Sequence, residues 1–196
     1  NLCSYLPAER KIYYIDQLIA TGIKHLQITS FVSPKAIPQM QDATTVAKTI
    51  VERHPDLDLF ALVPNFRGAQ NAHEAGLKKV NTVISLSRSH NMANVRKTHD
   101  QSFEELHKII EQLSDMEVVL DVATAFGCPF EGKQRSAQAV VDFCGRAYDM
   151  GVRTFNLCDT VGQSDPAQVA SFTHAMKKAF PDARLELHIH DTRGMG

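Results

Sequence analysis

The chain has 196 residues, of which 43% are hydrophobic and 22% are charged, and its formal net charge is −1. This composition is typical of a globular protein with one sizeable core, and it indicates a single domain over residues 1–196. The near-neutral charge argues against a nucleic-acid partner or an anionic membrane surface, and no apolar run approaches the roughly 20 residues of a membrane span. The cysteines form no CxxC pair, which favours reduced thiols in a reducing compartment; they are Cys3, Cys128, Cys144 and Cys158.

The sequence starts at Asn1 rather than at a methionine, and no signal-peptide pattern follows. We therefore expect it to be part of a longer protein. Helical periodicity comes first, at residues 9–21, and returns at residues 101–114. Asn65 and Asp165 are suited to the position before the first turn of a helix.

Strand-like segments alternate with these helical stretches. Three of them follow a glycine that is suited to ending a helix in the left-handed conformation, namely Gly22, Gly76 and Gly151. A spacing of roughly 25 to 35 residues between strands is typical of successive βαβ units in a parallel sheet. The six predicted strands lie within residues 21–30, 55–64, 75–87, 115–126, 150–160 and 181–192.

Two α/β architectures compete for this pattern, an open doubly wound sheet and a (β/α)8 barrel. No glycine-rich nucleotide-binding motif follows any predicted strand, which removes the usual reason for an open sheet. Polar residues instead follow nearly every strand, as in a barrel whose chemistry lies at the carboxyl ends of its strands. We therefore predict an incomplete (β/α)8 barrel with about six strands, and we expect two strands to lie outside the sequence.

The segment "HIH" contains the strongest chemical signal. His188 and His190 lie two residues apart on a predicted strand, so their side chains share one face with Cα atoms roughly 6.5 to 7 Å apart. Two such imidazoles can bind one divalent ion. Alternatively, one histidine caps a helix and the other is a hydrogen-bonded core residue. Asp159, at the end of the preceding strand, either orients a ligand histidine, assists proton transfer, or simply caps the turn that follows it.

Two loops carry weaker signals. Residues 87–100 are predicted to form a long polar loop, in which Arg88, Arg96 and Lys97 either bind the phosphates of a bulky ligand or are simply solvated. Cys128 is either a nucleophile or, as we favour, a packed small residue. The remaining histidines are expected at the surface in helices or connections: His25, His54, His73, His107 and His174.

Several longer motifs follow one another along essentially the whole chain: "TSFVSPKAIPQMQD", "ALVPNFRG", "SLSRSHNMANVRKT", "AFGCPFEGK", "CDTVG" and "HIHDTRGMG". In order and spacing they resemble the 3-hydroxy-3-methylglutaryl-CoA lyase family. The isopropylmalate and homocitrate synthases fit less well, because they typically read H-x-H-N-D at the histidine pair.

The resemblance implies strands 2 to 7 of a (β/α)8 barrel that binds Mg²⁺ or Mn²⁺. Such an enzyme cleaves 3-hydroxy-3-methylglutaryl-CoA to acetyl-CoA and acetoacetate, in leucine degradation and ketone body metabolism. By resemblance, His188 and His190 are metal ligands, and His188 and Asp159 are catalytic. The implied substrate-binding residues are Gln27, Ser30, Asn94 and Thr160.

Three residues depart from the family pattern and bear on the choice of substrate. Gln27 stands where the family usually has glutamate, Asp121 where it often has tyrosine, and Asn156 where serine is common. The family's Arg-Asp pair and its C-terminal asparagine and cysteine lie outside the sequence. Alternatives are therefore a lyase or aldolase for another 3-hydroxyacyl-CoA or a 2-oxo acid, and a non-catalytic barrel remnant. We expect a cytoplasmic location, with the mitochondrial matrix as the alternative, and the resemblance allows a homo-oligomer.

Overall fold

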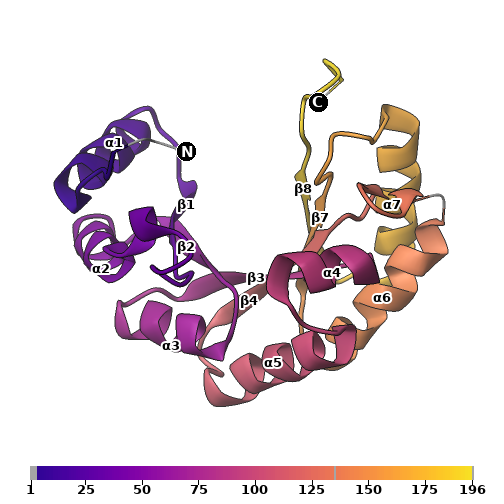
Figure 1. Cartoon of the computed structure of the whole chain (residues 1–196), viewed down its shortest axis with the longest axis horizontal. Coiled ribbons are helices and arrows are strands. Elements are labelled where there is room, and N and C mark those ends of the chain that lie inside the picture. The colour runs from indigo at the N-terminus through magenta and orange to yellow at the C-terminus, as the bar shows by residue number, and fades with distance from the viewer. Residues whose placement is uncertain (1–3, 135, 196) are drawn as a thin grey trace. The chain divides into compact units, whose positions relative to one another are not determined.

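The computed structural model describes residues 4–134 and 136–195, so Asn1 and Cys3 lie outside the described residues. Helices and strands alternate along the chain (Figure 1). The strands of the main sheet are β1 (His25–Ser30), β2 (Asp58–Val63), β3 (Lys79–Ser85), β4 (Glu117–Ala123), β7 (Thr154–Cys158) and β8 (Arg184–His188). The helices are α1 (Ala8–Ala20), α2 (Ala43–Arg53), α3 (Phe66–Glu74), α4 (Arg88–Val95), α5 (His99–Gln112), α6 (Ala137–Asp149) and α7 (Pro166–Ala179). Smaller elements are the 3-10 helix η1 (Pro38–Met40) and the hairpin strands β5 (Gly127–Cys128) and β6 (Gly132–Lys133).

The order of the strands decides between the two architectures. In the described part of the chain, six strands form one sheet in the order β1-β2-β3-β4-β7-β8. β1 with β2, β2 with β3, β4 with β7 and β7 with β8 are all parallel pairs. A doubly wound sheet reverses its strand order at a switch point, whereas successive strands of a (β/α)8 barrel are always neighbours. The predicted run of six barrel strands is therefore confirmed.

Local signals in the sequence explain where the elements begin and end. Gly22, Gly76 and Gly151 have φ values of 96°, 91° and 106°, the left-handed conformation that glycine adopts without steric cost. Asn65 accepts a hydrogen bond from the backbone N–H of Gly68 at 2.9 Å, and Asp165 caps α7 in the same way. These predicted caps are confirmed. No helix in the described ranges combines the length and the hydropathy needed to cross a membrane.

The predicted polar loop at residues 87–100 is wrong. This segment contains the helix α4 and the first two residues of α5; the connection between them begins at Arg96, whose φ of 56° is left-handed. The Ser87 hydroxyl caps α4 by accepting a hydrogen bond from the N–H of His90 at 3.0 Å. The helix escaped prediction because it is polar nearly all round, and Asn91 is the residue of α4 that is buried.

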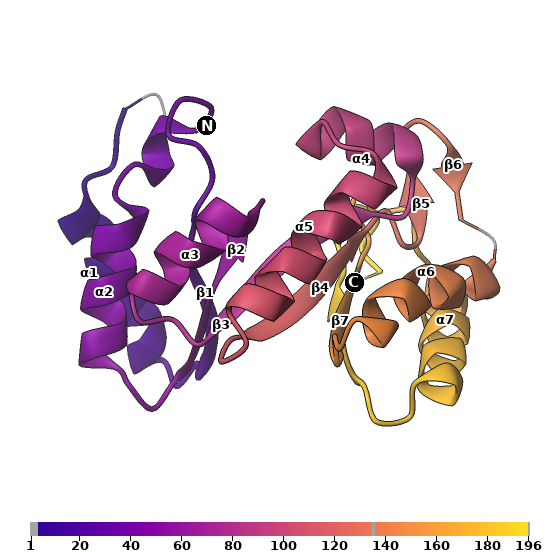
Figure 2. The same cartoon turned by 90° about the horizontal axis from the view of Figure 1, so that it is seen from below.

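The chain divides into two compact units. The first, unit 1, comprises Asn1–Thr82 and Glu111–Glu117; the second, unit 2, comprises Val83–Ile110 and Val118–Gly196. In unit 1, α1 lies beside α2 (Figures 1 and 2). Apolar side chains of α2 and β2 are fully or almost fully buried there, among them Val46, Ile50, Ala61 and Val63.

Charged residues occupy the amino ends of the strands in unit 1. His25, Asp58, Lys79 and Glu117 are each the first residue of a strand. Asp58 lies 2.6 Å from the His25 ring and 3.2 Å from the buried ammonium of Lys79, which is also 3.6 Å from Glu117. Burial raises the pKa of Asp58, but the hydrogen bonds from His25 and Lys79 outweigh it and hold that pKa below its usual value. His25 was expected at the surface in a helix or connection; it is exposed as expected, but its placement outside the strands was wrong because it lies within β1.

Unit 2 shows which face of its strands meets the helices. Phe155 of β7 is fully buried, and its ring lies 5.9 Å from that of Phe180, the residue after α7. α6 and α7 lie side by side next to β7 (Figures 1 and 2). Because side chains alternate along a strand, Thr154, Asn156 and Cys158 point to the opposite face.

Candidate functional site

The two histidines lie together at the carboxyl end of β8. His188 is the last residue of the strand, and both side chains are exposed. Their rings are 5.0 Å apart, centroid to centroid, and nearly perpendicular at 74°. The alternative of a core histidine is therefore wrong for both. Two neighbouring, solvent-facing imidazoles are available to bind a ligand.

Asp159 is buried beside this pair, with 1% of its surface exposed. Its carboxylate accepts hydrogen bonds from the N–H of Gln163 at 2.9 Å, the N–H of Ser164 at 3.1 Å and the hydroxyl of Ser164 at 2.7 Å. These bonds close the turn after β7, which is the capping role left open by the sequence. In addition, its backbone N–H donates to the His188 carbonyl at 2.9 Å. Asp159 thus connects the end of β7 to the strand that carries the histidines.

Hydrogen bonds link the strand ends of unit 2 to one another. The N–H of Ser87 donates to the Thr124 hydroxyl at 3.1 Å, and the N–H of Thr124 donates to the Thr160 hydroxyl at 2.7 Å. Thr124 has a φ of 59°, a conformation that is strained for a β-branched residue. Strain of this kind persists only where the surroundings enforce it, and it is concentrated at functional sites. The predicted substrate residue Thr160 therefore has a structural contact as well.

Sequence reasoning missed a polar cluster around Ser85, the last residue of β3. Ser85 is fully buried; its N–H donates to Asn91 at 3.0 Å and its hydroxyl lies 2.7 Å from Nδ1 of His90. Its carbonyl lies 2.8 Å from Nε2 of His99. The predicted substrate residue Asn94 lies on the same helix as His90 and Asn91 and is exposed. The cluster was missed because the helix that brings these residues together was read as a loop.

The two histidines of this cluster predict a loss of stability in mild acid. Burial lowers the pKa of His90 and of His99 below the usual 6.5. The unfolded chain therefore binds protons that the folded chain does not, so stability is complete above pH 6.5 and falls as the pH drops through the lowered values. The free energy of unfolding in urea should be higher at pH 7.5 than at pH 5, and His99→Gln should reduce this difference. The matched variant His174→Gln, on the exposed side of α7, should leave it unchanged; an equal effect of both would contradict the assignment.

The described cysteines are buried and free. Cys128 donates its S–H to the Ser87 hydroxyl at 3.0 Å, which fits the favoured alternative of a packed small residue. Burial raises the pKa of Cys144, and burial together with the nearby charge of Asp121 raises that of Cys158. None of these three residues takes part in a disulfide.

Unit 1 holds the two other predicted substrate residues. Gln27 is exposed and lies where the pairing of β1 with β2 shifts by one residue between Gln27 and Thr29. Ser30 is the last residue of β1, and its hydroxyl oxygen is buried without a hydrogen-bond partner in the described chain. Unit 2 brings together His188, His190, Asp159 and Thr160, whereas Gln27 and Ser30 belong to unit 1.

The histidine pair fits part of a divalent-metal site. Imidazole nitrogens are common ligands of divalent metals, and two rings 5.0 Å apart can approach one ion. Within the described ranges, no group of three or more His, Cys, Asp or Glu side chains is placed to hold an ion. The pair therefore accounts for two ligands, while Mg²⁺ requires about six, many of which are commonly waters and substrate oxygens.

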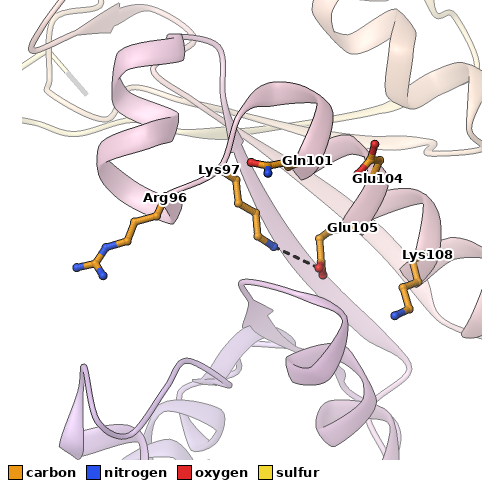
Figure 3. A pocket seen from close by; sticks show the side chains of 6 residues that line it. All are labelled: Arg96, Lys97, Gln101, Glu104, Glu105 and Lys108. Carbon is orange, nitrogen blue, oxygen red and sulfur yellow. Dashed lines mark ion pairs between the residues drawn. The ribbon is translucent and has the colours of Figure 1, made fainter.

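Open grooves on the described part of unit 2 include two that bear on the predicted site. One, of about 450 Å³, is lined by Lys133, Val161, Gly162, Gln163, Thr192 and Arg193 and shares Gly162 and Arg193 with a small hollow at His190. The other, of about 490 Å³, contains Arg96 and Lys97, the residues considered for phosphate binding (Figure 3). There Glu104 and Glu105 offset the positive charge, and Lys97 pairs with Glu105 at 3.4 Å. This mixed charge favours the solvated-surface alternative over a phosphate site.

Comparison with known proteins defines the family. The HMGL-like family model matches residues 2–196. The chain belongs to the HMGL-like family. This confirms the resemblance found in the sequence motifs.

Relatives of this HMGL-like chain match it along nearly all of its length. It is 37% identical to the hydroxymethylglutaryl-CoA lyase of Bacillus subtilis, over 97% of this chain and 64% of that protein. It is 36% identical to the (R)-citramalyl-CoA lyase of Chloroflexus aurantiacus, over 97% and 63% of the respective lengths. The structure of an HMG-CoA lyase from Acinetobacter baumannii, in complex with coenzyme A and 3-methylmalate, superimposes with a TM-score of 0.91 at 39% identity. That match covers 98% of this chain and 63% of the other, so the HMGL-like chain spans somewhat less than two thirds of these relatives.

Proposed function

We propose that the protein is a divalent-metal-dependent carbon–carbon lyase that cleaves 3-hydroxy-3-methylglutaryl-CoA to acetyl-CoA and acetoacetate. The observation that carries this proposal is the match of nearly the whole chain to lyases named for that substrate. The exposed histidine pair at the carboxyl end of β8 supports it, because active sites of (β/α)8 barrels lie at that end of the strands.

In this proposal His188 and His190 hold Mg²⁺ or Mn²⁺. When bound, the ion polarises oxygen atoms of the substrate and stabilises the negative charge that develops on them. His188 also takes part in proton transfer. Asp159 is proposed as the second catalytic residue; its N–H also donates to the His188 carbonyl, and its buried carboxylate keeps the turn at residues 159–164 in place. The proposed substrate contacts are Gln27, Ser30, Asn94 and Thr160.

The test is turnover by the intact protein. Incubation with 3-hydroxy-3-methylglutaryl-CoA and added Mg²⁺ or Mn²⁺ should yield equal amounts of acetoacetate and acetyl-CoA. EDTA should stop the reaction, and excess Mg²⁺ or Mn²⁺ should restore it. Absence of both products at every metal concentration would refute the proposed reaction.

A second candidate is a lyase of the same kind that acts on another 3-hydroxyacyl-CoA or on a 2-oxo acid. It is favoured by the similarity to a citramalyl-CoA lyase and by the buried polar pair Asp121 and Asn156. Comparison of kcat/KM for citramalyl-CoA and for 3-hydroxy-3-methylglutaryl-CoA separates the two. A protein that cleaves neither and binds no metal would instead be the non-catalytic barrel remnant.

The same proposal makes an acyl-CoA the substrate and assigns the protein to a cellular compartment. We place the protein in the cytoplasm, with the mitochondrial matrix as the alternative, because both are reducing and the three described cysteines are free. Similar lyases of Rattus norvegicus carry both locations in their names. Assembly as a homo-oligomer is part of the proposal and is tested by sedimentation.

A further inference from the structure

Two buried polar side chains meet across β4 and β7 of unit 2. Asp121 and Asn156 are Cα partners in the parallel pairing of these strands, and they are only 7% and 9% exposed. The side-chain amide of Asn156 donates a hydrogen bond from Nδ2 to Oδ1 of Asp121 at 2.9 Å. Both residues lie on the sheet face opposite to Phe155, and hence opposite to the face that packs against Phe180.

This hydrogen bond determines which way the amide of Asn156 points. Because the NH₂ group of Asn156 donates to the carboxyl group of Asp121, the amide oxygen points away from Asp121. That oxygen, Oδ1, is excluded from solvent and accepts no hydrogen bond from any described residue. A buried acceptor without a donor is costly, and an acceptor held in one orientation calls for a donor at one place.

Neighbouring side chains do not supply the missing donor. The partner of Asn156 on β8 is Glu186, whose carboxylate lies 3.2 Å from Arg184 and, when ionised, also only accepts. Glu186 and His188 are two residues apart and share a face of β8. Strand spacing and rise place the Cα atoms of Asn156 and His188 roughly 8 Å apart. An acyl group bound at the histidine pair would have to span about this distance to reach the amide oxygen.

We propose that Asn156, oriented by Asp121, is a specificity-determining residue that accepts a hydrogen bond from the 3-hydroxyl group of an acyl-CoA. The inference rests on the proposed function. It extends that function because Asn156, and not the metal ion alone, recognises the 3-hydroxyl group. A methyl or methylene group at the same place would leave Oδ1 buried without a donor. The site thus selects 3-hydroxyacyl-CoA esters over their deoxy analogues.

The test uses two ligands that differ by a single hydroxyl, 3-hydroxybutyryl-CoA and butyryl-CoA. Their Kd values are measured by calorimetry on the intact protein in EDTA, so that no metal ion contributes to the preference. A neutral hydrogen bond corresponds to roughly 10-fold in affinity, and we expect the native protein to prefer the hydroxy ester by about that factor. Asn156→Leu, which is similar in size but apolar, should bind both esters equally. Asp121→Asn should give a smaller preference than the native protein, because the amide of Asn156 is then free to turn.

The matched control is Asn71→Leu, an asparagine of α3 in unit 1, which should keep the native preference. Circular dichroism confirms that each variant is folded. Equal Kd values for the two esters in the native protein, or an unchanged preference in Asn156→Leu, would overturn the inference while acyl-CoA binding and the proposed reaction stand. Failure to bind either ester, both in EDTA and with added Mg²⁺, would refute the acyl-CoA proposal itself, and the inference with it.

Discussion

Replacing His188 by alanine is expected to lower the metal-dependent kcat more than 100-fold. Loss of a group that merely supports a metal ligand typically costs about 10- to 100-fold, and His188 is proposed to be a ligand itself and to move a proton. Because the side chain is exposed, the free energy of unfolding should change by less than about 0.5 kcal/mol. Steady-state kinetics at several Mg²⁺ concentrations measure kcat, and titration calorimetry with Mn²⁺ measures metal affinity. Urea unfolding measures stability.

A histidine of the same unit provides the control. His174 is exposed on α7, and His174→Ala should keep native kcat and native Mn²⁺ affinity. His190→Ala should lose Mn²⁺ affinity as His188→Ala does, since the two rings lie 5.0 Å apart. Full activity of His188→Ala would show that the ligand assignment is wrong.

Replacing Phe155 by alanine should reduce the free energy of unfolding by about 3 to 5 kcal/mol, the usual cost of emptying a large aromatic site in a core. Phe155 has no exposed surface and lies against Phe180 between β7 and the helices. Chemical denaturation monitored by circular dichroism gives the value. Phe130→Ala is the matched control, because its side chain is 61% exposed, and it should change stability by no more than about 0.5 kcal/mol.

A small effect at Phe155 would have consequences beyond stability. The alternation of side chains along β7 places Asn156 on the face opposite to Phe155. If removing the Phe155 ring cost less than about 1 kcal/mol, far below the usual cost for a core aromatic, the assignment of the two faces would be wrong. The proposed acceptor would then point toward the helices.

Sequence signals predicted the fold well where they were local. The strands and the ends of several helices could be predicted because glycines such as Gly151 and caps such as Asn65 act within a few residues. The barrel could be predicted because alternating strands and helices without a nucleotide-binding loop leave few other arrangements. Helix α4 could not, since its stability depends on Asn91 reaching the carbonyl of Lys97 and the hydroxyl of Ser102.

The candidate site was predictable in its residue types but not in its contacts. Spacing predicted that His188 and His190 share one face of a strand; the two rings do lie together, but β8 ends at His188 and His190 lies beyond it. Parallel strands brought Asp159 to the same edge of the sheet. The carboxylate of Asp159 caps the turn because the N–H groups of residues 163 and 164 point at it. The direction of these N–H groups cannot be predicted from the periodicity of the sequence. Asp121 and Asn156 were both recognised as unusual, but their hydrogen bond depends on the register of β4 against β7.

The charged residues at the amino ends of the unit 1 strands separate the stabilising ion pairs from the carboxyl ends of the same strands. In β1, His25 contacts Asp58, whereas Gln27 and Ser30, nearer the carboxyl end, are not part of that network. Mutations at the proposed substrate residues Gln27 and Ser30 therefore leave these ion pairs intact. Under the proposed function, the protein can change its preferred acyl group during evolution without first acquiring compensating stability.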